Sequence, residues 1–353
     1  MNVLLNPVVA ASEAANDCDQ FACFEVHPWQ WAALVGFIAL LLIVDLLVVH
    51  RTPHEIQFKE AAIESAVWIS IGVAFTGFMY WWHGGQAAGE YISGFLIEKS
   101  LSVDNVFVWA VIFSYFAVPS KYQFRTLFWG IFGALVLRAI FIFAGVALIN
   151  AFVWTLALFG AVLLYSAWRI AFHHEQEIDP DKSLVLRAVR RVIPSTNEYH
   201  GQKLFTLENG KRLATPLFAV LIMVETTDVV FAVDSIPAIL AVSQEEFIVF
   251  SSNAFAILGL RALYFCLNGM QDRFVYLNIG LGVILAFVGA KMLLTFTGDE
   301  FGFPTEDFHI PTPASLGVIV VVLTVTIVAS LRADRRQRPD EPDESVEAGT
   351  PSH

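Results

Sequence analysis

The sequence predicts an all-α polytopic membrane protein of about nine transmembrane helices. Of its 353 residues, 56% are hydrophobic and only 15% are charged, and the mean hydropathy is +0.62. The apolar residues fall in separate blocks of about 20 residues, the length of helix that crosses a bilayer. The short alternating segments that are typical of a transmembrane β-barrel are not seen along the chain.

The order of the apolar blocks gives the expected organisation. The nine spans are expected at about 30–49, 62–82, 92–116, 125–149, 151–170, 214–241, 247–267, 274–296 and 314–331. They divide the chain into an outer N-terminal tail, two leading helices, a three-helix unit, a cytoplasmic linker, a second three-helix unit, an outer loop with the ninth helix, and a disordered cytoplasmic tail. The corresponding ranges are 1–29, 30–91, 92–171, 172–213, 214–296, 297–331 and 332–353. Within the linker, a short amphipathic helix is expected near 184–192.

Basic residues predict the orientation. Of the 21 lysines and arginines, 17 fall in alternate connections, whereas the connections at 83–91, 243–246 and 297–313 contain none. Because basic residues accumulate in cytoplasmic loops, the N-terminus is expected outside and the C-terminus in the cytoplasm. The outer segments carry acidic residues without basic partners. Such a surface either concentrates cations or is simply a solvated acidic rim.

The two three-helix units resemble each other in sequence. SVDNVF around Asp104 matches TTDVVF around Asp228, 124 positions later; LVLRAIF (135–141) matches LGLRALY (258–264). FVWTLALFGAVLL (152–164) resembles FVYLNIGLGVILA (274–286) at a similar offset. Each unit crosses the membrane an odd number of times, so the repeats at 92–170 and 214–296 are expected to be inverted. Inverted repeats with a binding site near the midplane are a recurring plan of transporters.

Charged and polar side chains lie inside the third and sixth spans. Glu98, Ser102 and Asn105 are spaced i, i+4 and i+7, on one helical face, and Asp104 lies about 100° around from Asn105. In the sixth span Glu225 and Asp228 are i, i+3 neighbours.

The carboxylate of Asp234 would point away from Glu225 on a straight helix. Proline removes a backbone donor inside a helix, so we expect Pro237 to break the sixth span. The break would turn Asp234 toward Asp228 and Asp104 and expose the Val233 carbonyl, as in transporters with discontinuous helices.

Several interpretations of these buried acids are open. A charged residue at the bilayer centre costs at least about 2.5–3.5 kcal/mol. The acids could be neutral hydrogen-bonding groups between helices, could pair with Lys99, Arg138 and Arg261, or could reach water at span ends. Arg138 and Arg261 match between the repeats, and a structural counterion role is expected for them, with gating as the alternative.

The donor atoms favour a hard divalent cation. Carboxylates, amides, hydroxyls and carbonyls suit magnesium, calcium and manganese, and all nine histidines lie outside the spans, against a zinc or copper site. Protons or sodium are alternative or coupling ions. The candidate metal ligands are Glu98, Asp104, Asn105, Glu225, Asp228 and Asp234, with Asp45, Ser102, Thr227 and Val233 as additional candidates and Arg138, Arg261 and Pro237 as structural or gating residues.

Several segments resemble the TerC/Alx family of membrane proteins, a relative of the LysE-type transporters. They are EKSLSVDNVF, IFSYFAVP, VETTDVVFAVDSIPAILA, SNAFAILGLRALYF and FHIPT, and the match runs from about Val44 to Ala329. The resemblance implies a bacterial inner-membrane protein linked to manganese efflux, with an older label of tellurium resistance. It also implies that the family's acidic positions fall on the six candidate ligands. Tellurite is an oxyanion that carboxylates repel, so that label is interpreted as indirect.

The sequence thus favours a membrane transporter that exports Mn²⁺ through an acidic midplane site. The alternative is a membrane scaffold that assists metal loading of exported proteins, with 172–213 as its contact surface. An enzyme is not expected, because no nucleophile–base pair or nucleotide loop is found. The expected partners are the lipid bilayer and the metal ion, without nucleic acid or a resident cofactor. Cys18 and Cys23 share the outer tail and could form a small disulfide.

Overall fold

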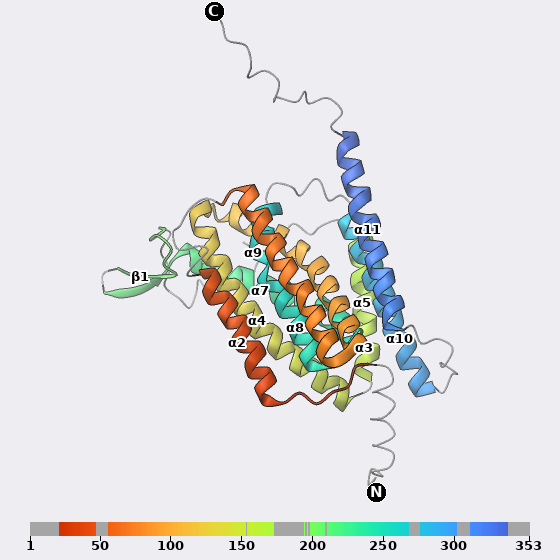
Figure 1. The fold of residues 1–353 in the computed structure, drawn as a ribbon. Coiled ribbons are helices and arrows are strands. Elements are labelled where there is room, and N and C mark those ends of the chain that lie inside the picture. Colours follow the sequence, from red (N-terminus) through yellow and green to blue (C-terminus); the bar gives the residue numbers. More distant parts are fainter. Residues whose placement is uncertain are drawn as a thin grey trace, which may run out of the picture.

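The fold is almost entirely helical, which confirms the prediction of a polytopic all-α membrane protein (Figure 1). The computed structural model describes residues 21–46, 56–152, 154–172, 194, 196, 198–208, 210–267, 276–301 and 311–337. Six helices in this part of the chain are long and apolar enough to cross a membrane, and two shorter apolar helices accompany them. The number of crossings, nine, remains a prediction.

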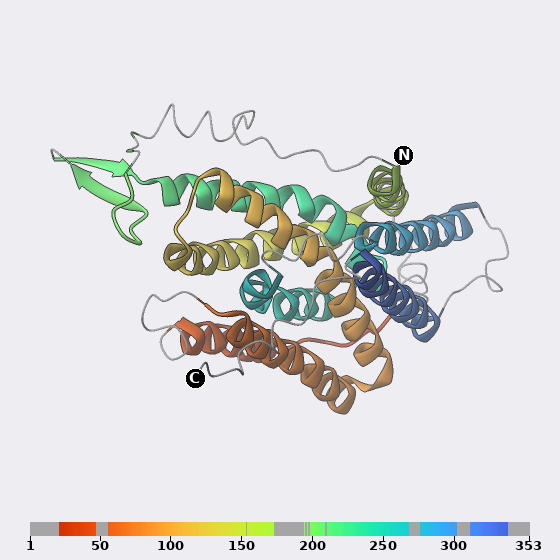
Figure 2. The same ribbon diagram turned by 90° about the horizontal axis from the view of Figure 1, so that it is seen from above.

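The two leading spans and the third span lie in two continuous elements. α2 covers Pro28–Val44, and α3 covers Phe58–Tyr115, which consists of two helical parts joined at Gly84. Gly84 lies within the connection expected at 83–91, and the hydroxyl of Tyr91 donates to the carbonyl of Gly72, so the second part folds back against the first. The helix is interrupted at Gly84, where φ is +88° and ψ is −176°, a conformation that glycine adopts at little cost. Figure 2 shows the two parts of α3 leaving this bend in different directions.

The remaining helices follow the expected order of spans. They are α4 (Ser120–Ala151), α5 (Trp154–Phe172), α7 (Pro216–Leu240), α8 (Glu246–Leu258), α9 (Leu260–Leu267), α10 (Leu277–Phe301) and α11 (Thr312–Gln337). α7 begins with Pro216 at its first position after Thr215, where the missing amide hydrogen costs no helical hydrogen bond. The span expected at 247–267 is divided at Gly259 into α8 and α9.

The helices of the two predicted repeats pack in a reciprocal pattern. α3 packs against α8, α4 packs against α7, and α5 packs against α10. A two-fold relation between the units would produce this exchange of partners. The inverted repeat itself stays a prediction, but its first and second helices are those that meet across the middle of the molecule.

The segment between the units contains a hairpin that the sequence analysis did not anticipate. β1 (Phe205–Glu208) pairs antiparallel with β2 (Lys211–Ala214) through a turn in which Gly210 has φ +75°. The hydroxyl of Tyr199 donates to the carbonyl of Phe116, at 2.6 Å, and Gln202 donates to the carbonyl of Lys121, at 3.2 Å. The hairpin segment is therefore fastened to the α3–α4 connection. The helix expected near 184–192 lies outside the described residues.

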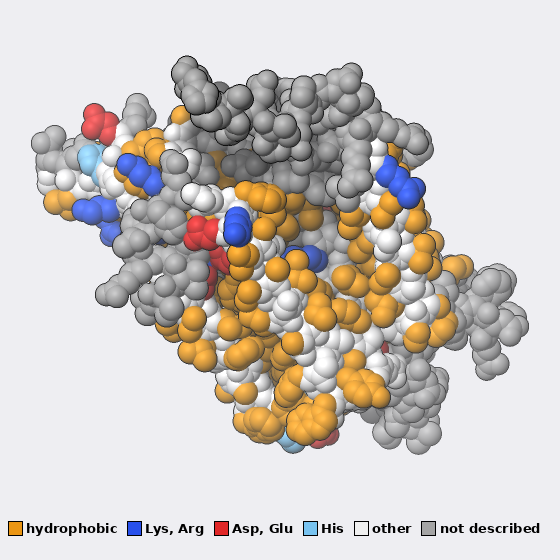
Figure 3. Space-filling model, turned by 45° about the horizontal axis from the view of Figure 1, so that its top comes forward, with side chains coloured by type: hydrophobic (Ala, Val, Ile, Leu, Met, Phe, Trp, Pro, Cys, Tyr) orange, Lys and Arg blue, Asp and Glu red, His pale blue; other side chains and the backbone are white. Residues whose placement is uncertain are grey.

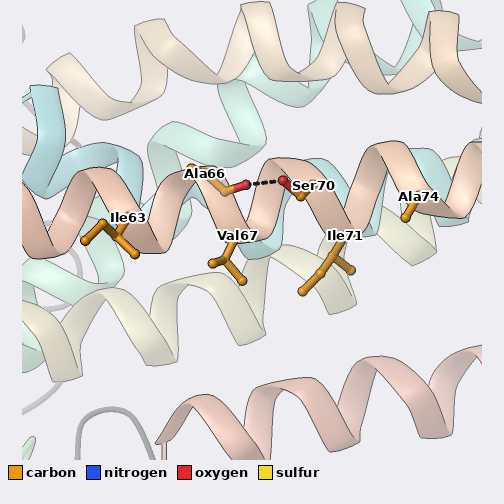
Figure 4. A pocket seen from close by; sticks show the side chains of 6 residues that line it. All are labelled: Ile63, Ala66, Val67, Ser70, Ile71 and Ala74. Carbon is orange, nitrogen blue, oxygen red and sulfur yellow. Dashed lines mark hydrogen bonds between the residues drawn. The ribbon is translucent and has the colours of Figure 1, made fainter.

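Most side chains on the face shown in Figure 3 are hydrophobic. Exposed apolar residues such as Ile63, Val321 and Val325 would contact solvent water in a soluble protein, and here they suit lipid tails. A shallow groove lies on the first part of α3 (Figure 4) and is lined by Ile63, Ala66, Val67, Ser70, Ile71 and Ala74. The Ser70 hydroxyl donates to the carbonyl of Ala66 in the same helix, so this groove offers a cation no charged ligand.

Candidate functional site

Arg138 joins the two predicted repeats at the centre of the bundle. Its side chain extends from α4 and binds Glu98 of α3 and Asp228 of α7, and all three residues are at most 3% exposed. Nη2 donates to Asp228 Oδ1 at 3.0 Å and Nε donates to Asp228 Oδ2 at 3.4 Å, while Nη1 donates to Glu98 Oε1. One guanidinium therefore bridges a carboxylate from each unit. Breaking such a buried pair by removing one partner typically costs about 3–5 kcal/mol.

Neutral polar side chains complete the surroundings of this ion-paired centre. Ser102 donates to Glu98 Oε1 at 3.0 Å, and Asn253 of α8 donates through Nδ2 to Glu98 Oε2 at 3.2 Å. Arg138 Nη1 also donates to the hydroxyl of Ser235, at 3.2 Å. The centre formed by Glu98, Ser102, Arg138, Asp228, Ser235 and Asn253 is called the Arg138 centre below.

Among the buried oxygen atoms that accept no hydrogen bond from the described residues are three on α3, α7 and α8, the helices that supply Glu98, Asp228 and Asn253. They are Asn105 Oδ1, Glu225 Oε2 and Asn253 Oδ1. A buried oxygen without a donor is costly, and oxygens of this type are ligands that hard divalent cations favour. The chemistry of these atoms therefore fits the predicted metal, although the structure holds them as separate positions.

The acids are not gathered into one preformed cluster. Among the described residues, no group of three His, Cys, Asp or Glu side chains is arranged to hold a metal ion. Glu98 and Asp228 meet through Arg138, and Glu225 lies against the backbone of Gly133 in α4. Asp104 is half-buried on α3, and the assignment of all six as ligands remains a prediction.

Asp234 lies apart from the Arg138 centre, which differs from the expected arrangement. Its Oδ1 accepts a hydrogen bond from the hydroxyl of Ser166 in α5. α7 continues through Pro237 to Leu240, and the amide of Ala241 donates to the Pro237 carbonyl at 3.0 Å. The predicted break at Pro237 is therefore wrong. A continuous helix directs Asp234 toward α5 instead of toward Asp228.

Arg261, the counterpart of Arg138 in the second repeat, forms a separate ion-paired centre. Its Nη2 binds Asp45 and lies 2.7 Å from Glu64 Oε1, and its guanidinium carbon is 4.0 Å from the centre of the Phe124 ring. These contacts fasten α9 to α2 and to the first part of α3. Asp45 was an additional candidate metal ligand; the structure places it beside this arginine.

Three residues of the two ion-paired centres are absent from the residues predicted for the site: Ser235, Asn253 and Glu64. Ser235 and Asn253 lie in the segments VDSIPA and SNAF, which carry the family resemblance, but hydroxyls and amides are common in membrane helices and gave no separate signal. Glu64 lies in the second span and was overlooked, although an acid at membrane depth indicates a buried partner. Among the additional candidates, Thr227 donates to the carbonyl of Val224, at 2.8 Å, within its own helix.

The apolar helices and their buried ion pairs define a multi-pass integral membrane protein. The chain belongs to the Integral membrane protein TerC family, whose model matches residues 83–338. No solved structure matches it.

Two relatives illustrate the similarity. An uncharacterized membrane protein of Myxococcus xanthus is 45% identical over 317 residues, covering 90% of this chain and 96% of the relative. The Escherichia coli K12 protein named "Putative membrane-bound redox modulator Alx" is 43% identical over 311 residues, covering 85% of this chain and 94% of the relative. Both alignments include nearly the whole relative, so the similarity is not confined to one segment.

Proposed function

We propose that this TerC family protein is a membrane transporter that exports a hard divalent cation, with Mn²⁺ as the favoured substrate, from the cytoplasm of a bacterium. The observation that carries the proposal is the meeting of Glu98 and Asp228 through Arg138. These buried carboxylates come from the first helix of each predicted repeat. Transporters built from such repeats bind substrate where the repeats meet.

The chemistry of the proposed site supports a cation as substrate. Glu98, Asp228 and Glu225 supply carboxylate oxygens, and Asn105 and Asn253 supply amide oxygens without donors among the described residues. These are oxygen ligands of the kind that Mn²⁺, Mg²⁺ and Ca²⁺ share. The preference for Mn²⁺ rests on the family resemblance rather than on the donor set.

The number of crossings, the orientation and the absence of a cofactor belong to the same proposal. We propose nine crossings, with the N-terminus outside and the C-terminus in the cytoplasm, because this arrangement places basic connections in the cytoplasm. The protein would then act without a resident cofactor and without catalysis. Tellurium resistance, if it occurs, would be an indirect consequence of ion transport.

The decisive experiment measures intracellular Mn, Mg, Ca, Fe and Zn in cells with and without the protein under manganese load. Glu98→Gln and Asp228→Asn keep the shape of each side chain but remove its charge, so Mn²⁺ efflux should fall to the level of cells without the protein. Membrane insertion and abundance of both variants are measured in detergent extracts, and efflux is compared at equal abundance. Undiminished efflux in both would leave these acids as structural groups and would favour the scaffold alternative, which instead predicts sensitivity to changes within 172–213.

A further inference from the structure

Arg138 occupies the position where a cation would contact both carboxylates of the proposed site. Nη1 reaches Glu98, while Nε and Nη2 reach Asp228. Arg138 is 1% exposed, so solvent screens the charges of the two acids only weakly. Lys99 is adjacent to Glu98 in sequence, but its amino group donates to the Ala256 carbonyl of α8, at 3.1 Å.

The charges of this centre depend on which cation is present. Glu98 and Asp228 together carry two negative charges when ionised, and Arg138 reduces their sum to a single negative charge. A divalent ion bound to both acids would neutralise them completely. With Arg138 still paired, the same ion would give a net positive charge in a buried site, which is unfavourable. Metal binding and the complete set of arginine contacts therefore oppose each other.

The surroundings of Glu98 contain an oxygen that the arginine does not use. Asn253 donates through Nδ2 to Glu98 Oε2, and its own Oδ1 is buried without a donor among the described residues. An arginine cannot accept a hydrogen bond, but it could donate to this oxygen, and it does not. Asn253 Oδ1 is therefore available to a metal ion that replaces the arginine at Glu98.

We propose that Arg138 is a tethered cation that occupies the Glu98–Asp228 pair when no metal is bound. Its role is to reduce the charge of the empty site from two negative charges to one, so that the transporter can return to the cytoplasmic side without carrying another cation back. This inference rests on the proposed function and extends it to the coupling of transport. Each Mn²⁺ that crosses should then carry its two charges uncompensated by protons or sodium.

The first test uses the wild-type protein in liposomes loaded with MnCl₂ alone, with equal pH and no sodium on either side. Net Mn²⁺ flux should proceed when potassium and valinomycin allow charge to balance, and it should carry two charges per ion. A flux that requires an opposing proton or sodium gradient would overturn the inference while leaving Mn²⁺ transport intact. Wild-type protein that moves no Mn²⁺ in any condition would overturn the proposed function itself.

The second test separates net flux from exchange of labelled Mn²⁺ against unlabelled Mn²⁺. Exchange never requires the empty site to cross the membrane, whereas net flux does. Arg138→Gln should lose about a hundredfold more of net flux than of exchange, because unpaired buried acids oppose the return step. Acidic pH should restore part of the net flux, since protons would then neutralise the acids. Arg138→Lys, which retains a cation, should keep more net flux than Arg138→Gln.

Arg261→Gln is the matched control, because it removes a buried guanidinium from the equivalent position of the other repeat. It should lower stability and reduce exchange and net flux equally. Equal loss of both modes in folded Arg138→Gln, or net flux as fast as in the wild type, would show that Arg138 is a structural counterion only. If Arg138→Gln does not fold, the charge count of the wild type and the ratio of modes in Arg138→Lys decide the question.

Discussion

The carboxylate of Glu225 lies directly over the backbone of Gly133, where α4 has no side chain. A Cβ added at Gly133 would come within 2.7 Å of Glu225 Oε2 and still nearer to Oε1. Gly133 lies five positions before Arg138 on the same helix. The glycine therefore makes room for the acid beside the helix that carries the central arginine.

Gly133→Ala should consequently displace the Glu225 carboxylate rather than the α4 backbone, because the clashing atoms are the far end of a flexible side chain. We expect a strong loss of Mn²⁺ efflux, with a loss of stability of no more than about 1–3 kcal/mol. Efflux assays and thermal unfolding of the purified protein measure the two effects. Gly77→Ala is the control, since a Cβ there meets no atom within 4 Å. Normal efflux in Gly133→Ala would remove Glu225 from the site.

Asp234 should matter less for transport than Asp228. Its Oδ1 is bound by Ser166 of α5, whereas Asp228 is bound by Arg138 in the central site. Ser166→Ala should lower stability by about 1.5–3 kcal/mol, the usual worth of a hydrogen bond to a charged group, and Asp234→Asn should lower it less, because the amide oxygen still accepts from Ser166. Both should retain more efflux than Asp228→Asn when compared at equal abundance. Complete loss of efflux in Asp234→Asn, with efflux kept in Ser166→Ala, would restore Asp234 as a ligand.

Pro237→Ala should leave transport intact. α7 is continuous at this position, so alanine adds an amide donor in a helix that already has its shape, and proline in a helix interior typically costs about 3 kcal/mol. The melting temperature should stay the same or rise. A variant with a normal melting temperature but little efflux would indicate that a broken α7 occurs during transport.

The stability of the protein should fall as the pH rises toward neutrality, in part through Glu245. Burial, followed by repulsion from Glu246, raises the pKa of Glu245 from 4.5 to about 7. A raised pKa means that the folded state binds the proton more tightly than the unfolded state does. This contribution is complete below about pH 4.5 and is lost by about pH 7. Melting temperatures measured between pH 5 and 8 should show a smaller slope in Glu245→Gln; an unchanged slope would contradict the assignment.

The sequence predicted the helical class because apolar blocks of spanning length have few alternative structures. It also located the buried acids and the arginines, since charge at membrane depth is conspicuous. It failed at Pro237, because a helix can accommodate proline where neighbouring helices satisfy its freed backbone groups. It placed the connection at 83–91, within which the chain turns, but it did not predict the shortness of that turn, which requires only Gly84. Which acid meets which arginine depends on packing between helices far apart in sequence, and no local pattern encodes it.

The hairpin segment has a mechanical consequence. Tyr199 and Gln202 bind the α3–α4 connection, and the chain enters α7 at Pro216, 14 residues after Gln202. The end of α3 and the segment that leads into α7 are thus held together, while Glu90 lies near the opposite end of α3's second part. If one predicted repeat rotates against the other during transport, the rotation would be centred on these held ends. The Glu90 end of α3 would then move farthest. The contacts of Tyr199 and Gln202, more than 25 residues from Glu90 along the chain of α3, would limit how far that end can move.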